Sequence, residues 1–298
     1  MPPVNKQMHL LCAAALALPP VLALAQSLPA APAAPAPAAS AASAPHAHTH
    51  AIDTRAARVR GLAEQMNRPP NELKQSCRFE SDIPTPPPRG LVALSFDDGP
   101  EPGATEAILA LLDKHQVPAT FFLIGAKTER HPELAARIQA HPLALVGNHS
   151  WSHPNFHDIP AARQVNELSR SDTLLAPLEA PKLFRYPYGN ASCASNAQLQ
   201  QMGYRIVGWH VDTCDWAFDK TGSIDPHEAK ICGVDKANRE HFVDHVVAAV
   251  QARQGGIVLM HEIHPNTLAQ LGTLITRLQA AGFAFAPLTH PGFQPSLR

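Results

Sequence analysis

From Leu91 onward the chain alternates between short apolar runs and amphipathic stretches, and this alternation predicts strands and helices in turn. "LVALSF" has the continuous apolar character of a buried strand, and "TEAILALLDKH" has apolar residues at helical spacing. Further strands are predicted in "ATFFLIG", "LALVG", "KLFRYP", "YRIVGWH", "GGIVLMH" and "FAFAPL". Further helices are predicted in "PELAARIQAH" and at residues 161–175, 196–202, 239–253 and 267–281.

Regular alternation of strands and helices predicts an α/β fold with a parallel sheet, because each parallel crossover needs a connecting helix. About seven strand–helix units within roughly 200 residues favour a closed (β/α) barrel of about seven parallel strands. An open, doubly wound sheet is the alternative fold.

Polar clusters follow five of the predicted strands. They are "FDDGP", "GNHSWSH", "RYPYG", "HVDTCDW" and "MHEIH". In a parallel α/β fold the carboxyl ends of the strands converge on one face, where active sites are built. We therefore expect these five clusters to meet in one site.

The second cluster places His149 and His153 four residues apart, so they share a face if the segment forms one helical turn. Asn148 can cap that turn and Pro154 ends it. With a carboxylate from another strand end, the pair makes a two-histidine, one-carboxylate site. Such a set suits zinc hydrolysis and also non-haem iron oxygenation. Iron sites of this type usually keep the acid and one histidine nearly adjacent in the sequence. Here the candidate acid lies about fifty residues before the histidines, which favours hydrolysis.

Two other hydrolase types are excluded by spacing. "HEIH" (residues 261–264) is one residue short of the metalloprotease motif. Ser150 and Ser152 flank the histidines, but no G-x-S-x-G elbow is present for a serine nucleophile.

The adjacent acids Asp97 and Asp98 end the first strand. Because neighbours on an extended strand point in opposite directions, one aspartate can bind metal while the other faces the substrate. The second aspartate then needs a cation such as Arg185, for which a purely structural salt bridge is the alternative. His261 is a candidate proton donor, and Asp215 can orient it.

Five motifs in order, "SFDDGP", "HSWSH", "RYPYG", "DTCDW" and "LMH", give residues 90–288 a strong resemblance to the polysaccharide deacetylase family, or NodB-homology domain. The resemblance implies a distorted (β/α) barrel. It also implies metal-dependent hydrolysis of the acetyl group from N-acetylglucosamine units of a polysaccharide or oligosaccharide, either peptidoglycan, a chitin-like chain or an exported glycan.

Carried over by position, the resemblance makes Asp97 the general base and Arg185 its partner. The metal ligands it implies are Asp98, His149 and His153. A set of one carboxylate and two imidazoles without a thiolate leads us to expect Zn²⁺, with Co²⁺ or Ni²⁺ as substitutes.

The same resemblance makes His261 the general acid and Asp215 its partner. The backbone N–H of Tyr188 is implied to help bind the oxyanion, and Trp216 and Leu259 to wall the pocket for the acetyl methyl group. Two other functions stay open: an O-acetyl esterase on acetylated xylan and a carbohydrate-binding pseudoenzyme.

The N-terminus has the pattern of a secretory signal, with a lysine, an apolar stretch at about residues 10–24 and an A-x-A site that predicts cleavage after Ala25. Pro19 and Pro20 interrupt this stretch, which is too short for a transmembrane helix. We expect residues 1–25 to be a signal peptide, 26–51 an Ala/Pro-rich disordered linker, 52–89 a wrapping segment and 90–290 the catalytic domain. The expected location is exported, either periplasmic or secreted.

Charge and cysteines complete the expectations. A formal net charge of -1 without a basic run argues against nucleic-acid binding, and we expect a monomer.

Four cysteines follow the signal peptide, which allows three disulfide connectivities. We predict a Cys214–Cys232 bridge closing a loop beside the site, which leaves Cys77–Cys193 to tie the wrapping segment to the barrel.

Overall fold

The computed structural model of the protein describes residues 77–298. The predicted signal peptide, the linker and residues 52–76 of the wrapping segment lie outside the described residues. Within residues 77–298, none of the helices is long and apolar enough to cross a membrane.

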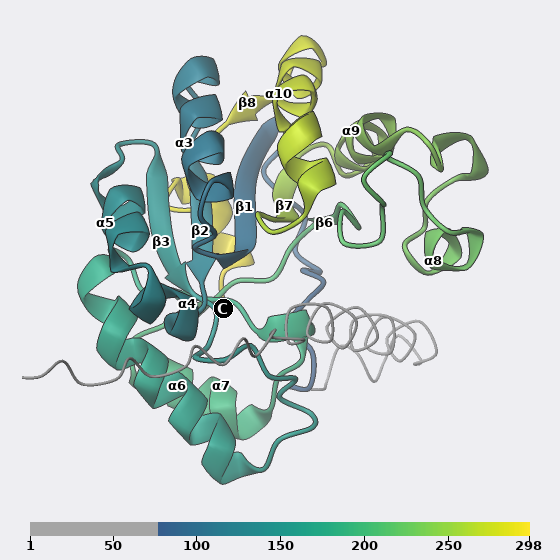
Figure 1. The fold of residues 1–298 in the computed structure, drawn as a ribbon. Helices are drawn as coiled ribbons and strands as arrows, with labels where there is room; N and C mark the ends of the chain where they lie inside the picture. The colour runs from purple at the N-terminus through teal and green to yellow at the C-terminus, as the bar shows by residue number, and fades with distance from the viewer. Residues whose placement is uncertain (1–76) are drawn as a thin grey trace, which may run out of the picture. The chain divides into compact units, whose positions relative to one another are not determined.

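A single sheet of eight strands, all paired in parallel, forms the centre of the fold (Figure 1). The strands are β1 (Leu91–Gly99), β2 (Ala119–Leu123), β3 (Ala144–Asn148), β4 (Leu183–Phe184), β5 (Arg205–Ile206), β6 (Val211–Asp212), β7 (Gly256–His261) and β8 (Ala284–Phe285). Their order is β5-β4-β3-β2-β1-β7-β6, and β8 pairs with β1.

This strand order confirms the expected distorted (β/α) barrel. Neighbours in the sheet follow the chain from β1 to β5 on one side, and the path ends at β5 and β6, which do not pair with each other within the described residues. The result is a curled half-barrel. A doubly wound sheet would instead reverse its strand order near the middle.

Helices cover the outside of the curled sheet (Figure 1). They are α3 (Ala104–His115), α4 (Gly125–Arg130), α5 (Pro132–Ala140), α6 (Ala161–Leu175), α7 (Cys193–Gln201), α8 (Pro226–Ile231), α9 (Phe242–Arg253) and α10 (Pro265–Ala280). Short 3-10 helices are η1 (Ala176–Leu178), η2 (Pro187–Gly189), η3 (Lys236–Asn238) and η4 (Pro291–Ser296). The long helices match the predicted amphipathic stretches, whereas α4 and α8 were not predicted.

Apolar side chains fill both faces of the central strand β1. Val92, Leu94 and Phe96 belong to the cluster beneath α3 and α10, and the Phe96 ring lies 5.4 Å from that of Phe121. On the opposite face Ala93 packs in a second cluster with residues near the C-terminus such as Phe293. Burial on both faces explains why β1 reads as a continuous apolar run.

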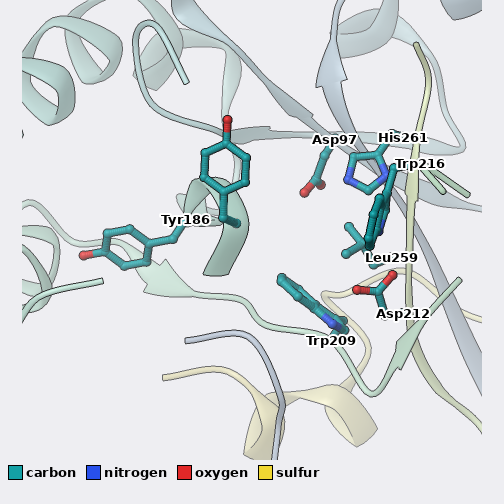
Figure 2. Close-up of a pocket in the computed structure, with 8 residues that line it drawn as sticks. Asp97, Tyr186, Trp209, Asp212, Trp216, Leu259 and His261 are labelled. Carbon is teal, nitrogen blue, oxygen red and sulfur yellow. The ribbon is translucent and has the colours of Figure 1, made fainter. Parts of the chain in front are cut away.

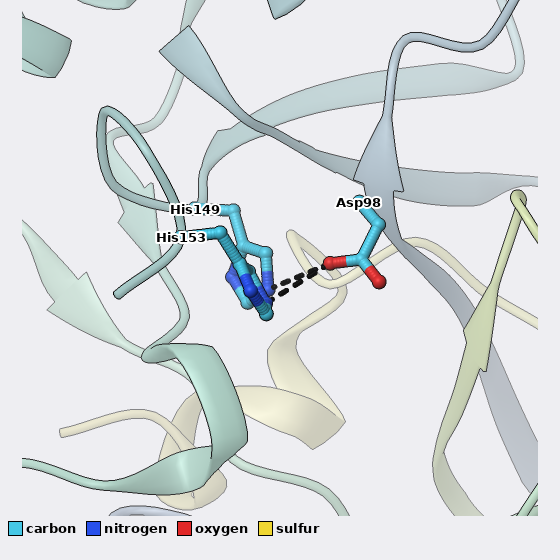
Figure 3. A group of neighbouring side chains, drawn as sticks. All are labelled: Asp98, His149 and His153. Carbon is cyan, nitrogen blue, oxygen red and sulfur yellow. Dashed lines mark ion pairs between the residues drawn. The ribbon is translucent and has the colours of Figure 1, made fainter. Parts of the chain in front are cut away.

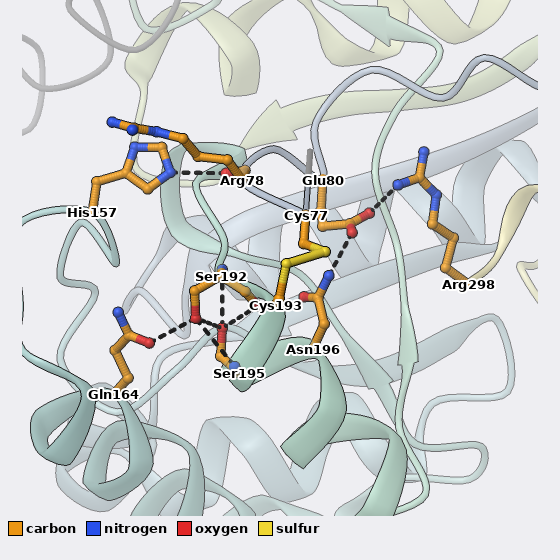
Figure 4. The surroundings of a disulfide bond; sticks show 10 residues. All are labelled: Cys77, Arg78, Glu80, His157, Gln164, Ser192, Cys193, Ser195, Asn196 and Arg298. Atoms are coloured by element: carbon orange, nitrogen blue, oxygen red, sulfur yellow. Dashed lines mark hydrogen bonds and ion pairs between the residues drawn. A yellow bond between two sulfur atoms is a disulfide. The ribbon is translucent and has the colours of Figure 1, made fainter. Parts of the chain in front are cut away.

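The described part of the wrapping segment lies along the loops that follow β4 and β5. Its backbone pairs at Glu80 with Gly189 and at Ile83 with Trp209. The Cys77–Cys193 disulfide ties it to the first residue of α7, with the Glu80–Arg298 ion pair nearby at 2.6 Å (Figure 4).

The second disulfide joins Cys214, just after β6, to Cys232 at the end of α8 across 18 residues. It closes the long insertion whose first residues include Trp216. Both bridges have the pairing that the sequence analysis expected.

Candidate active site and metal centre

A bulge at the end of β1 sets the directions of the two adjacent aspartates. Asp97 pairs with Phe122 and Gly99 with Leu123, so Asp98 is the extra residue, and its φ is 74°. The expectation that the aspartates point in opposite directions is therefore wrong. A left-handed residue breaks the alternation of the strand, so His149 Nε2 lies 3.6 Å from Asp97 Oδ2 and 3.5 Å from Asp98 Oδ1.

Glu262, which the sequence analysis did not select, is buried beneath this bulge. Its Oε1 lies 1.3 Å from where a Cβ on Gly99 would be, so a side chain at that position would have to displace the Glu262 carboxyl group. Thr105 Oγ1 donates to Glu262 Oε2 at 2.5 Å. Burial raises the pKa of Glu262 to about 8. The sequence pattern gives no sign of this contact, because Gly99 ends β1 and Glu262 follows β7, far apart in the chain.

The two histidines are brought together by a loop and not by the predicted helical turn. Ser150 and His153 have φ values of 68° and 58°, which no right-handed helix contains. Asn148 Oδ1 accepts from the Ser150 N–H at 3.0 Å, and Ser150 Oγ accepts from the His153 N–H at 3.1 Å. Side-chain hydrogen bonds thus replace helical ones, and Asn148 caps this loop instead of a helix.

Asp98, His149 and His153 form a buried cluster in which one ligand atom from each lies within 4.8 Å of the others (Figure 3). The distance from His153 Nε2 to Asp98 Oδ1 is 3.1 Å. His149 Nδ1 lies 2.8 Å from the Arg185 carbonyl oxygen, and a carbonyl only accepts, so Nδ1 carries the proton.

That hydrogen bond leaves the Nε2 lone pair of His149 directed at Asp98. Among residues 77–298 this buried atom makes no hydrogen bond. A buried imidazole acceptor without a donor, beside a second imidazole and a carboxylate, fits a divalent metal with open coordination positions.

Asp97 is held by Arg185, whose side chain is fully buried directly after β4. Arg185 NH1 donates to Asp97 Oδ1 and to Ser95 Oγ, both at 2.8 Å. Nε and NH2 of Arg185 donate to the carbonyl oxygens of Val207 and Gly208 at 3.2 Å and 3.1 Å. Burial lowers the pKa of Arg185, and the charge of Asp97 opposes this. The pairing expected from sequence is therefore present, and it leaves Asp97 Oδ2 on the side of the histidines.

A second acid–base pair stands across the site. His261 Nδ1 lies 2.7 Å from Asp215 Oδ1, and both residues are buried. Burial would raise the pKa of Asp215, but the charge of His261 and a 2.5 Å hydrogen bond from Thr267 Oγ1 bring it below its usual range. Thr267, in the first turn of α10, was not selected from the sequence.

Asp97 and His261 face one pocket (Figure 2). It is lined by Asp97, Tyr186, Tyr188, Trp209, Asp212, Trp216, Leu259 and His261. The structure thus brings together the predicted base, acid and three pocket residues, while Tyr186, Trp209 and Asp212 are additions. Their positions inside or beside the sequence motifs could have identified them.

Tyr188 connects the pocket to the metal cluster. It lies in η2 with φ of 60°, and its ring is 4.8 Å from the ring of His153 in an edge-on contact. The left-handed Tyr188 lies three residues after Arg185, in the segment that follows β4.

Comparison with known proteins matches residues 85–207 to the family model described as polysaccharide deacetylase. The chitooligosaccharide deacetylase of Bradyrhizobium sp. is 34% identical over 214 residues, which cover 66% of this chain and 88% of that relative. The chain belongs to the polysaccharide deacetylase family. A peptidoglycan-N-acetylglucosamine deacetylase of Listeria monocytogenes is 31% identical over 210 residues, 70% of this chain, which spans 40% of the length of that relative.

Solved structures of family members share the fold. The Bc1960 peptidoglycan N-acetylglucosamine deacetylase superposes with a TM-score of 0.58 at 28% identity, covering 74% of this chain and 95% of that one. A family 4 carbohydrate esterase from Streptomyces lividans, in complex with acetate, gives 0.55 at 29% identity, with coverage of 70% and 96%. A family pseudoenzyme from Bacillus anthracis gives 0.55 at 25% identity, with coverage of 69% and 66%. Because this family fold includes a pseudoenzyme, activity has to be argued from the site.

Proposed function

We propose that the protein is a metal-dependent polysaccharide deacetylase that removes N-acetyl groups from N-acetylglucosamine units. The observation that carries the proposal is the buried cluster of Asp98, His149 and His153, with Asp97 beside it and His261 in the same pocket. A metal ligand set, a general base and a general acid are all present, which argues against a pseudoenzyme. The similarity to a peptidoglycan-N-acetylglucosamine deacetylase and a chitooligosaccharide deacetylase supports the same reaction.

The donor set of one carboxylate and two imidazoles fits Zn²⁺, with Co²⁺ or Ni²⁺ as substitutes. When bound there, such an ion supplies Lewis-acid polarisation of the substrate carbonyl and lowers the pKa of a bound water toward ~7.

Asp97 acts as the general base in this proposal. Its Oδ1 accepts a hydrogen bond from Arg185 NH1 at 2.8 Å, which fixes the orientation of the carboxylate. Its Oδ2 faces the histidine cluster and is the oxygen that takes the proton from the attacking water. Arg185 therefore orients the base.

The pocket wall binds the acetyl group. Trp216 and Leu259 offer apolar surface for the methyl group, and the Tyr188 backbone N–H stabilises the developing oxyanion. Because the pocket also contains Asp97 and His261, the amide carbon is held between the base and the acid.

His261 protonates the departing nitrogen, which is too poor a leaving group without a proton. Asp215 accepts a hydrogen bond from Nδ1 of His261. The other ring nitrogen, Nε2, is directed away from Asp215 and makes this transfer. The cleaved C–N bond thus leaves a free amine on the sugar and an acetate ion.

The protein is proposed to act outside the cytoplasm as a monomer, with residues 90–290 as its catalytic domain. Two disulfides within the described residues support an oxidising compartment. Intact mass of the exported protein tests cleavage after Ala25, and light scattering tests the monomer.

Incubation of Zn²⁺-loaded protein with N-acetylated chitooligosaccharides, peptidoglycan fragments and acetylated xylan, followed by mass spectrometry, tests the reaction. The proposal expects loss of acetyl groups from the N-acetylated glycans, abolished by a chelator and restored by added metal. Acetate released only from xylan would identify an O-acetyl esterase. Unchanged masses in every sample would identify a pseudoenzyme.

A further inference from the structure

Next to the loop that carries His149 and His153, called the histidine loop here, three buried side chains from distant parts of the sequence are linked by hydrogen bonds. Tyr204 stands directly before β5, Glu179 follows η1, and Asn148 ends β3. Their exposed fractions are 3%, 8% and 1%. Tyr204 Oη donates to Glu179 Oε2 at 2.7 Å, and Asn148 Nδ2 donates to Tyr204 Oη at 3.0 Å.

The directions of these bonds follow from the number of protons available. A phenol has one proton, and Tyr204 gives it to Glu179, so toward Asn148 its oxygen can only accept. Glu179 Oε2 can accept whether or not Oε1 is protonated. The Asn148 amide must therefore turn its NH2 group to Tyr204 and its carbonyl oxygen to the other side.

On that other side the amide oxygen accepts from the Ser150 N–H, and Ser150 Oγ accepts from the His153 N–H. A flipped Asn148 amide would place its NH2 group against the Ser150 N–H, two donors facing each other. Ser150 would then lose the contact that holds its left-handed backbone, which directs the chain from His149 to His153.

We propose that Tyr204, oriented by Glu179, is a positioning residue for the metal-binding histidine loop, because it fixes which way the Asn148 amide faces. This inference rests on the metal site of the proposed function. Lys182 supports the arrangement, because its Nζ lies 5.0 Å from the centre of the Tyr204 ring and is itself held by Asp172 at 2.7 Å.

Removing the phenol oxygen tests the inference. Tyr204→Phe should weaken Zn²⁺ binding ~10-fold, the lower end of the effect of outer partners on metal affinity. Competition with a chromophoric chelator measures the affinity, and the visible absorption spectrum of the Co²⁺-loaded protein reports the ligand geometry without any need for activity.

Ser171→Ala is the matched control. It removes a fully buried hydroxyl that donates to the Leu168 carbonyl oxygen within α6. The control should lower the thermal midpoint yet keep the affinity and the Co²⁺ spectrum of the wild type. A loss of affinity in the control equal to that of Tyr204→Phe would overturn the inference, because both losses would then reflect general destabilisation.

A reversal of the hydrogen-bond direction provides a second, independent test. Asn148→Asp, measured above about pH 8 so that Glu179 has released its proton, puts a second acceptor against Tyr204, whose single proton cannot serve both neighbours, and should weaken Zn²⁺ binding. Adding Glu179→Gln supplies an N–H donor to Tyr204, which can then give its proton to the new carboxylate. The double variant should recover the Co²⁺ spectrum and affinity, whereas merely structural roles predict that the losses add.

The outcomes separate the two claims. Wild-type protein that binds no Zn²⁺ would overturn the proposed function and this inference together. Wild-type protein that binds Zn²⁺, with unchanged affinity and spectrum in Tyr204→Phe, would overturn the inference alone. If Tyr204→Phe does not fold, the recovery of Asn148→Asp by Glu179→Gln decides, and failure to recover contradicts the inference.

Discussion

Asp215 holds His261 through two hydrogen bonds, one from the backbone N–H to Oδ2 and one from ring Nδ1 to Oδ1, each 2.7 Å long. Both residues are almost fully buried, so this contact fixes the position, the ring orientation and the tautomer of His261 together.

Asp215→Asn should therefore lower turnover by about 10²–10⁴-fold, the usual contribution of acid–base catalysis, because the orientation and tautomer of the His261 ring are no longer fixed.

Acetate release tests this prediction. Thr267→Val, which removes only the hydrogen bond to Asp215 Oδ2, should lower turnover by less. Wild-type turnover in Asp215→Asn would rule out His261 as an acid that Asp215 positions.

Arg185→Met should destabilise the protein by about 3 kcal/mol or more, because Asp97 would remain as a buried charge without its partner. Urea unfolding measures the loss. Adding Asp97→Asn should return part of the stability, since the pair is then neutral on both sides. Purely additive losses in the double variant would show that the two residues do not interact as the 2.8 Å contact indicates.

The stability of the protein should depend on pH through Glu179. Burial raises the pKa of Glu179 from 4.5 to about 8. Between these values the unfolded chain has released the proton and the folded protein keeps it, so the folded state binds more protons and stability falls as pH rises.

Glu179→Gln has no proton to release, so its free energy of unfolding should fall less steeply between about pH 5 and 8. The difference in slope should approach ~1 kcal/mol per pH unit. Chemical unfolding of both proteins across this range measures it. Parallel curves would mean that Glu179 is ionised in the folded protein at neutral pH.

The strand–helix alternation was predictable because the buried faces of strands and helices leave a periodic pattern of apolar residues in the sequence. The helix predicted at residues 161–175 is α6, and "GGIVLMH" contains β7. The bulge at Asp98 was not predictable, because it arises from register against β2, which adjacent residues do not encode. The same holds for the loop of His149 and His153, where side-chain capping prevails over helical spacing.

The site residues that lie inside the sequence motifs were predictable. The residues that support them from outside these motifs were not. Asp97, Asp98, His149, His153 and His261 all meet as the five strand ends implied. Glu262, Thr267 and Tyr204 instead contact neighbours of those residues, namely Gly99, Asp215 and Asn148. A buried hydroxyl or carboxyl in a helix or strand looks ordinary in a sequence until its partner is known.

The disulfide beside the site should be detectable and stabilising. Non-reducing peptide mapping should link Cys214 to Cys232, and Cys232→Ser should lower stability by ~3 kcal/mol in the chain-entropy account of a loop of this length. Cys77→Ser, which opens the other bridge, is the comparison. Free thiols at both Cys214 and Cys232 in the exported protein would contradict the pairing.

The central claim is that the two adjacent aspartates divide the work, Asp98 as metal ligand and Asp97 as base. The two variants Asp97→Asn and Asp98→Ala separate these roles, because the first keeps all three ligands and the second removes one of them. Asp97→Asn should keep its metal and lose about 10²–10⁴-fold in turnover, while Asp98→Ala should lose metal affinity and recover partly with excess Zn²⁺.

Bound metal and acetate release from an N-acetylated chitooligosaccharide, measured side by side for the wild type and both variants, test this claim most directly. The account predicts full metal without turnover in Asp97→Asn and depleted metal in Asp98→Ala. Metal lost from Asp97→Asn and kept by Asp98→Ala would reverse the roles, and full activity in both variants would place the reaction elsewhere.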